Sequence, residues 1–222
     1  MAVMIEVWGD YACFTRPELK TERVSYDVIT PSAARGILDS VYWHPGMLWV
    51  IDNIWVCNPI RFANIRRNET KSKISGRNAK TAMMRGTTAG LELSSTADRQ
   101  QRATLLLTDV RYVIEAHFEL IPEKMGSEDS ADKFQAIVMR RLSKGQCYHQ
   151  PCFGCREFPA HFQLCEQIPP CPEELKGQHD FGFMLYDMDF SDAESFKPLL
   201  FRARMQDGRI AVPPRYSEEV LG

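Results

Sequence analysis

The most regular alternation of apolar and polar residues lies between Asp109 and Leu120. From Val110 onward every second residue is apolar, and most of the residues between them are polar or charged. A period of two is typical of a β-strand that buries one face. Two other segments rich in Val, Ile and Trp, residues 3–8 and 48–57, predict further buried strands.

The segment after Thr30 has the pattern of an amphipathic helix. Thr30 is a favourable N-cap and Pro31 suits the first helical position. Apolar residues then recur at helical spacing as far as Tyr42. The sequence His44-Pro45-Gly46 predicts the end of the helix, because the residue before a proline avoids the α region.

A second helix is predicted over Ser127–Lys144. Acidic residues stand at its start and basic residues at its end, as the helix dipole favours. Its apolar stripe consists of Phe134, Ile137, Val138 and Leu142.

Three strands are predicted near the C-terminus: 181–190, 199–205 and 209–212, the last two joined by a turn at Gln206-Asp207-Gly208. With the segment after residue 60 set aside, the first six elements follow the order β-α-β-β-α-β, ending with the strand 181–190. This order predicts an α+β fold of the ferredoxin-like or RRM-like class, whose open sheet is a common RNA platform. We expect the main domain over residues 1–175 and a small antiparallel β-sheet extension over 176–222.

Composition favours an ordinary globular protein. The chain has 222 residues, of which 44% are hydrophobic and 25% charged. The first eight residues lack the basic start of a signal peptide, and there is no run of about 18 apolar residues to span a membrane. The seven cysteines are expected to be reduced. We therefore expect a cytoplasmic protein.

Positive charge is concentrated between Arg61 and Arg85. This window holds eight cations and one anion, a net charge of +7, whereas the whole chain carries −2, so the remainder carries −9. We predict that residues of about 61–105 form a long inserted arm. Its length favours a function, and its charge favours a polyanion such as nucleic acid. The alternative is a solvated loop.

Five short sequences together resemble one protein family. They are Trp8-Gly-Asp-Tyr-Ala-Cys-Phe-Thr-Arg-Pro-Glu18, Tyr26-Asp-Val-Ile-Thr-Pro-Ser-Ala-Ala-Arg-Gly36, Val41-Tyr-Trp-His-Pro45, Tyr112-Val-Ile-Glu-Ala-His-Phe118 and Gly154-Cys-Arg-Glu-Phe158. In this order they resemble the CRISPR-associated RAMP family called Cas five, in its subtype I-C form. The resemblance runs nearly from end to end.

The resemblance implies a ferredoxin-like RAMP fold with an inserted basic arm. It also implies a metal-independent endoribonuclease that cuts precursor crRNA at the base of the repeat stem. Such a protein then holds the 5′ handle inside the Cascade complex, beside the backbone RAMP and the large subunit. It needs no cofactor and no membrane. Contact with target DNA near the PAM is left open.

The family's catalytic Tyr and Lys match Tyr42 and Lys133. The family often has His directly after this Lys, where this chain has Phe134, which cannot transfer a proton. His44 and His149 are candidates for the missing imidazole. Because of Phe134, the alternative is a non-catalytic subunit that only binds the handle.

Basic residues are expected to bind RNA phosphates. Those in the arm are Arg66, Arg67, Lys73, Arg77 and Lys80, and those on the second helix are Arg140, Arg141 and Lys144. Arg156 is expected either to contact RNA or to pair with an acid. We expect no metal site, although Cys147, Cys152 and Cys155 leave zinc binding as an alternative.

Overall fold

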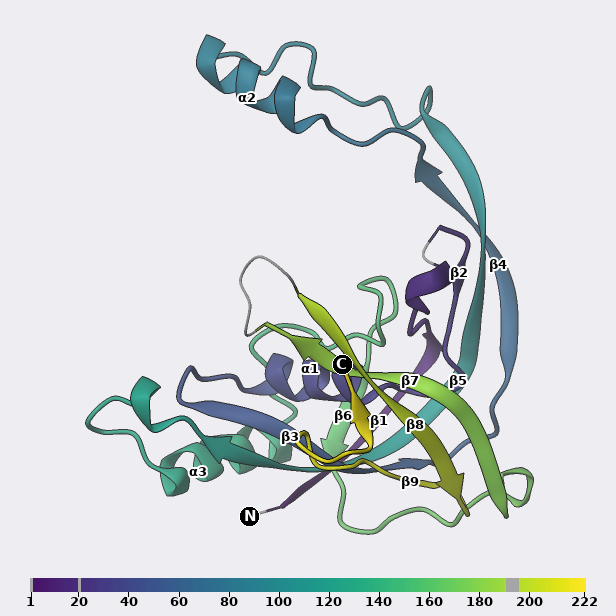
Figure 1. Cartoon of the computed structure of the whole chain (residues 1–222), viewed down its shortest axis with the longest axis vertical. Helices are drawn as coiled ribbons and strands as arrows, with labels where there is room; N and C mark the ends of the chain where they lie inside the picture. Colours follow the sequence, from purple (N-terminus) through teal and green to yellow (C-terminus); the bar gives the residue numbers. More distant parts are fainter. Residues whose placement is uncertain (1, 20, 191–195) are drawn as a thin grey trace.

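The computed structural model describes residues 2–19, 21–190 and 196–222, which form a mixed α/β body with a long projecting arm (Figure 1). The central element is strand β5 (Arg99–Leu120), which has 22 residues. Its C-terminal part runs through the body and its N-terminal part forms one side of the arm. The alternation seen between Asp109 and Leu120 therefore belongs to only half of a longer strand.

Four antiparallel strands form the sheet of the body. Strand β5 lies between β1 (Val3–Ala12) and β3 (Met47–Val56), and β1 also pairs with the short strand β6 (His161–Leu164). The resulting order is β6-β1-β5-β3. A two-residue strand, β2 (Arg23–Val24), pairs in parallel with β5 where the arm begins.

The sixth element of the predicted series was assigned wrongly. The strand that follows the second helix and joins this sheet is β6, which pairs Ile5 with Leu164 and Trp8 with His161. The predicted strand 181–190 instead forms part of β7 (Gln178–Asp189), which pairs with β8 (Lys197–Gln206). With only four residues, the strand β6 is too short to show a clear alternating pattern in the sequence.

Two helices cover one face of the sheet. Helix α1 (Pro31–Val41) begins as predicted, with the Thr30 side chain accepting a hydrogen bond from Ala33 N. Helix α3 (Ala131–Ser143) begins four residues later than predicted, because Ser130 caps it by accepting from Lys133 N. The fully buried residues Phe134 and Val138 of α3 pack into the same core as Ile37 and Leu38 of α1.

The arm consists of two long strands and a helix. Strand β4 (Phe62–Thr70) pairs with β5 from Phe62 opposite Leu107 to Thr70 opposite Arg99. Helix α2 (Gly76–Arg85) lies at the far end of the arm, away from the body (Figure 1). The sequence predicted a hairpin or a loop here and did not predict α2, whose one buried residue is Ala82.

The C-terminal strands continue the sheet beyond β3. Strand β9 (Arg209–Ala211) pairs with both β3 and β8, and β10 (Val220–Leu221) pairs with β8. The predicted turn between β8 and β9 is present, with Asp207 and Gly208 both at positive φ. The remaining elements are short 3-10 turns at Pro17–Leu19, Pro122–Lys124 and Glu173–Leu175. Within the described ranges, no helix is both long and apolar enough to cross a membrane.

Candidate active site and basic surface

Tyr42 lies at the C-terminal end of α1, where the chain leaves the helix. Its backbone is extended, and its N–H donates to Leu38 O at 2.9 Å. The Tyr42 side chain is 8% exposed and contacts two side chains of α3, those of Phe134 and Arg141. The Phe134 ring is 6.1 Å from the Tyr42 ring, and the Arg141 guanidinium lies over that ring at 5.1 Å.

Lys133 lies at the start of α3, one residue before Phe134, whose ring contacts that of Tyr42. Its ammonium is 3.2 Å from Asp129 Oδ1 and 3.4 Å from the Glu128 carbonyl oxygen. Asp129 Oδ2 accepts from Gly126 N and lies 3.4 Å from His44 Nε2. One carboxylate therefore lies beside both the Lys133 ammonium and the His44 imidazole.

His44 supplies an imidazole beside the position where the family often has one. Its ring centroid is 4.7 Å from that of Phe134, and its Nδ1 accepts from Gly46 N. The other candidate, His149, instead has its Nε2 3.1 Å from Ser40 Oγ on α1. No hydrogen bond, ion pair or ring contact joins His149 to Tyr42 or Lys133 in the described structure.

The charges around Tyr42 act on its phenol in opposite directions. Burial raises the pKa of Tyr42, and the Asp129 carboxylate raises it further, whereas Arg141 and Lys133 lower it. The net shift is upward, so the phenol stays protonated at neutral pH. The Gly126 N–H, the Lys133 ammonium and the His44 ring all lower the pKa of Asp129, which stays charged.

Sequence reasoning missed two residues of this site. Asp129 was interpreted as a helix-start acid, although its position four residues before Lys133 is the spacing of a helical ion pair. Trp43 follows Tyr42 and is 61% exposed, an unusual exposure for so large an apolar side chain. An aromatic face in this position can stack on a base of single-stranded RNA.

Most arm cations project into solvent. Arg66 lies on the exposed side of β4, and Lys73, Arg77 and Lys80 surround the start and middle of α2. None of the four forms an ion pair with another described residue. Near the end of α2, Met83 and Met84 are each 82% exposed. The arm thus offers a flexible apolar surface with free positive charge beside it.

Arg67 differs from the other arm cations because it is held within the protein. Its guanidinium pairs with Glu69 on the same strand and with Glu157 of the segment between α3 and β6, and its Nε donates to Thr104 Oγ1 at 2.9 Å. Arg23 approaches the same two glutamates. This cluster fastens the base of the arm to the body.

The basic residues of α3 also divide into two groups. Arg140 and Lys144 are exposed, as is Arg156 in the loop before β6. Arg141 is half-buried; its guanidinium donates to the Val41 carbonyl and covers Tyr42. Arg141 therefore fixes the end of α1 against α3.

The cysteine cluster does not have the arrangement of a metal site. Cys155 is buried, and its sulfur lies 3.2 Å from Arg23 Nη1. A hydrogen bond with the Cys13 thiol and the nearby Arg23 guanidinium lower the pKa of Cys155 to about 6. Among the described residues, no three His, Cys, Asp or Glu side chains are grouped to hold a metal ion.

The residues around Tyr42 are suited to acid–base chemistry on a phosphodiester. An imidazole can move a proton, an ammonium can neutralise phosphoryl charge, and a protonated phenol can donate a hydrogen bond. These groups come from the end of α1 and the start of α3. They lie on the helical side of the sheet.

Sequence comparisons match nearly the whole chain. Residues 2–213 match the Cas5d family model, described as CRISPR-associated protein (Cas_Cas5). The chain is 50% identical, over 98% of its length and 97% of the relative, to the CRISPR pre-crRNA endoribonuclease Cas5d of Mannheimia succiniciproducens. It is 36% identical, over 97% of its length and 93% of the relative, to the protein of the same name from Thermus thermophilus.

Two solved structures share the fold across the chain. One is a functionally uncharacterized protein from Streptococcus mutans, with a TM-score of 0.70 and 22% identity, covering 100% of this chain and 97% of that chain. The other is a CRISPR-associated protein with a TM-score of 0.69 and 20% identity, at the same coverage. The family match and the 50% identity together show that this chain belongs to the Cas5d family of CRISPR-associated proteins.

Proposed function

We propose that this chain is a metal-independent endoribonuclease that cuts precursor crRNA at the base of the repeat stem. The observation that carries the proposal is that Lys133 and His44 both pair with the Asp129 carboxylate, while the rings of His44 and Tyr42 both contact Phe134. The endoribonuclease name of a relative that is 50% identical supports it.

In the proposed reaction the substrate's own 2′-hydroxyl is the nucleophile. His44 takes the proton of this hydroxyl at Nδ1, which gives up its hydrogen bond from Gly46 N. The hydroxyl oxygen attacks the adjacent phosphorus, and the bond from phosphorus to the 5′-oxygen breaks. The 5′-oxygen takes a proton from water, and the hydroxide left behind takes the proton that His44 has gained, so the products are a 2′,3′-cyclic phosphate and a 5′-hydroxyl. Lys133 neutralises the charge that develops on the phosphoryl oxygens.

Tyr42 has the role of a hydrogen-bond donor in this proposal. Its raised pKa makes it a poor base at neutral pH, but its protonated hydroxyl can orient the scissile phosphate. The hydroxyl makes no hydrogen bond with another described residue. It is therefore available to a substrate.

We further propose that the product stays bound through its 5′ handle, inside a Cascade complex of subtype I-C. The free cations of the arm and of α3, including Arg66, Lys80 and Lys144, are suited to the phosphates of a single strand. In this proposal β1, α1, β3, β5, α3 and β6 are a ferredoxin-like core, residues 1–175 are the main domain and 176–222 are an extension. The strand order β6-β1-β5-β3 supports the assignment of the core.

The test is incubation of the purified chain with a labelled repeat RNA in EDTA. A parallel series of substrates carries one 2′-deoxy substitution at each candidate cut position. We expect one cut at the stem base, blocked by a single deoxy position, with a cyclic phosphate on the upstream product.

A second candidate function is supported by Phe134. A subunit that binds the handle without cutting would have no need of the family's frequent His at this position. Tight binding of the repeat RNA without any cut by the wild-type chain would favour this function over the nuclease.

A further inference from the structure

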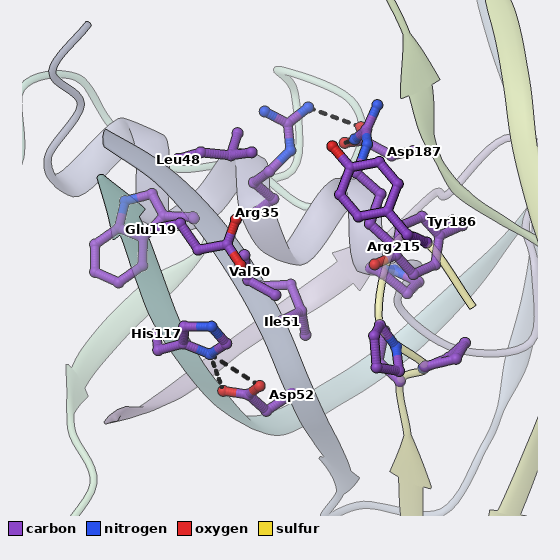
Figure 2. A pocket seen from close by; sticks show the side chains of 16 residues that line it. Arg35, Leu48, Val50, Ile51, Asp52, His117, Glu119, Tyr186, Asp187 and Arg215 are labelled. Atoms are coloured by element: carbon purple, nitrogen blue, oxygen red, sulfur yellow. Dashed lines mark hydrogen bonds and ion pairs between the residues drawn. The ribbon is translucent and has the colours of Figure 1, made fainter. Parts of the chain in front are cut away.

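A cavity of about 190 Å³ lies between the start of α1, strands β3 and β5, and the C-terminal segment (Figure 2). Its walls are largely apolar and include Leu48, Val50, Val212, Pro213 and Pro214. None of the residues assigned to RNA or to cleavage lines it. Tyr216, also part of the lining, is 93% exposed.

Three carboxylates from three different strands converge on this cavity. They are Asp52 of β3, Glu119 of β5 and Asp187 of β7, and all three line its wall. Glu119 is exposed, and its side chain forms no hydrogen bond or ion pair with another described residue. In Figure 2 the Glu119 side chain lies between the His117–Asp52 pair at one end of the cavity and the Arg35–Asp187 pair at the other.

The cations that line the cavity are already neutralised. Arg35 lies 2.8 Å from Asp187, and Arg215 lies 3.0 Å from the other oxygen of the same carboxylate. Each arginine also approaches a second acid, Asp39 for Arg35 and Asp189 for Arg215. This end of the cavity therefore has no net positive charge to offer an anion.

The opposite end is acidic. The His117 Nδ1 lies 2.8 and 2.9 Å from the two oxygens of Asp52, as Figure 2 shows, and Glu119 is the next outward-facing residue along β5. Among the described residues, neither Asp52 nor Glu119 forms an ion pair with an arginine or a lysine. A phosphate would meet a repulsive field in this cavity, which disfavours RNA as its ligand.

We propose that this cavity binds an arginine or lysine side chain of a protein partner. The aliphatic stem of such a side chain packs on apolar walls while its cationic end reaches a carboxylate. Arginine suits the site better than lysine, because its planar group pairs with two acceptors at once and stacks on an aromatic ring such as Tyr216. Buried arginines are frequent anchors of protein interfaces.

The charge distribution of the chain supports a protein rather than RNA at this surface. Residues outside the window 61–85 carry −9, and the cavity belongs entirely to that acidic part. Two different surfaces thus serve two kinds of partner. The proposal does not depend on the nuclease assignment.

The test is titration of the full chain with N-acetyl-arginine methylamide, followed by the NMR signal of the His117 ring. The neutral citrulline analogue and cytidine monophosphate are titrated in parallel. We expect a saturable shift with the arginine compound, and at least tenfold weaker binding of the citrulline compound. The double variant Asp52→Asn, Glu119→Gln should lose the shift, whereas Glu92→Gln, an exposed acid in the arm, should keep it.

Two outcomes would overturn the proposal. A saturable shift with the nucleotide but not with the arginine compound would make the cavity an RNA site. The absence of saturable binding by either compound would show that the cavity holds no such side chain. RNA cleavage by the double variant should equal that of the wild type, so a failure of the nuclease proposal would be seen separately.

Discussion

The rings of His44 and Phe134 pack against each other with their centroids 4.7 Å apart. His44 thus lies where it can take over a proton transfer that Phe134 cannot perform. We expect His44→Ala to reduce the single-turnover cleavage rate by about 100-fold or more, the typical contribution of a general acid or base. RNA affinity should change little. An unchanged rate would remove His44 from the mechanism.

The contact between His44 and Phe134 predicts that a second substitution can restore cleavage to the His44→Ala variant. In the His44→Ala background, Phe134→His should recover part of the lost rate. The new imidazole takes the position of the Phe134 ring, which contacts the ring of His44 in the wild type. Phe134 is fully buried, so the thermal unfolding of the variant must be compared with that of Phe134→Leu. A folded double variant that stays as slow as the single variant would contradict the rescue.

Lys133→Ala should stop cleavage and preserve much of the RNA affinity, since the ammonium acts on charge that develops in the transition state. Lys133→Arg should recover part of the rate. The measurement is a pair of assays, single-turnover cleavage and filter binding of an uncleavable deoxy substrate. If Lys133→Ala cuts as fast as the wild type, Lys133 is only a solvated helix-start residue.

Tyr42 should contribute no ionisation to the pH–rate profile below about pH 10, the ordinary tyrosine pKa, because its own pKa is raised. Tyr42→Phe should therefore lower the rate by a constant factor between pH 6 and pH 9, as roughly expected when only a hydrogen bond is lost. A factor that changes with pH across this range would assign Tyr42 a proton-transfer role.

Asp129 should stabilise the fold in a pH-dependent way. Its folded pKa is lowered, so its contribution to the free energy of unfolding is present above the ordinary carboxyl pKa of about 3.9 and is lost as the pH falls through the lowered value. Urea unfolding of the wild type and of Asp129→Asn should differ at neutral pH and converge in acid. If the difference in the free energy of unfolding between the two proteins did not change with pH, the charge of Asp129 would not be the cause of the stabilisation.

Substitutions of two arm cations, Lys80 and Arg67, should have different effects on the salt dependence of RNA binding. Lys80→Ala should weaken RNA binding and reduce the slope of log K against log[salt] by about one phosphate contact. Arg67→Ala should act chiefly by loosening the base of the arm, because its guanidinium is held by Glu69 and Glu157. Amide hydrogen exchange over β4 should therefore increase in Arg67→Ala and not in Lys80→Ala.

The start of α1 and the hairpin turn could be predicted from the sequence because local residues determine them. Thr30 and Pro31 begin α1 as expected, and Asp207-Gly208 forms the expected turn. The short strand β6 could not be found in this way, since its four residues gain their strand conformation from pairing with β1. The helix α2 could not be found either, because it is polar on average and buries only Ala82.

The candidate site could be predicted only in part for the same reason. The resemblance placed Tyr42 and Lys133, which are 91 positions apart in the sequence, in one site. It left the choice between His44 and His149 open, because that choice depends on how the turn after α1 meets the start of α3. Asp129 lies just before α3, and its contact with His44 is a tertiary contact with no local signal.

The projection of a cationic arm from an acidic body makes the molecule an electric dipole on the scale of its own length (Figure 1). If the arm binds RNA as proposed, this field should turn an approaching strand before any contact forms, so that the strand meets α2 first and the acidic body last. Orientation is thus selected during diffusion, and fewer encounters are lost to wrong poses. Added salt should slow this capture step more than it speeds dissociation.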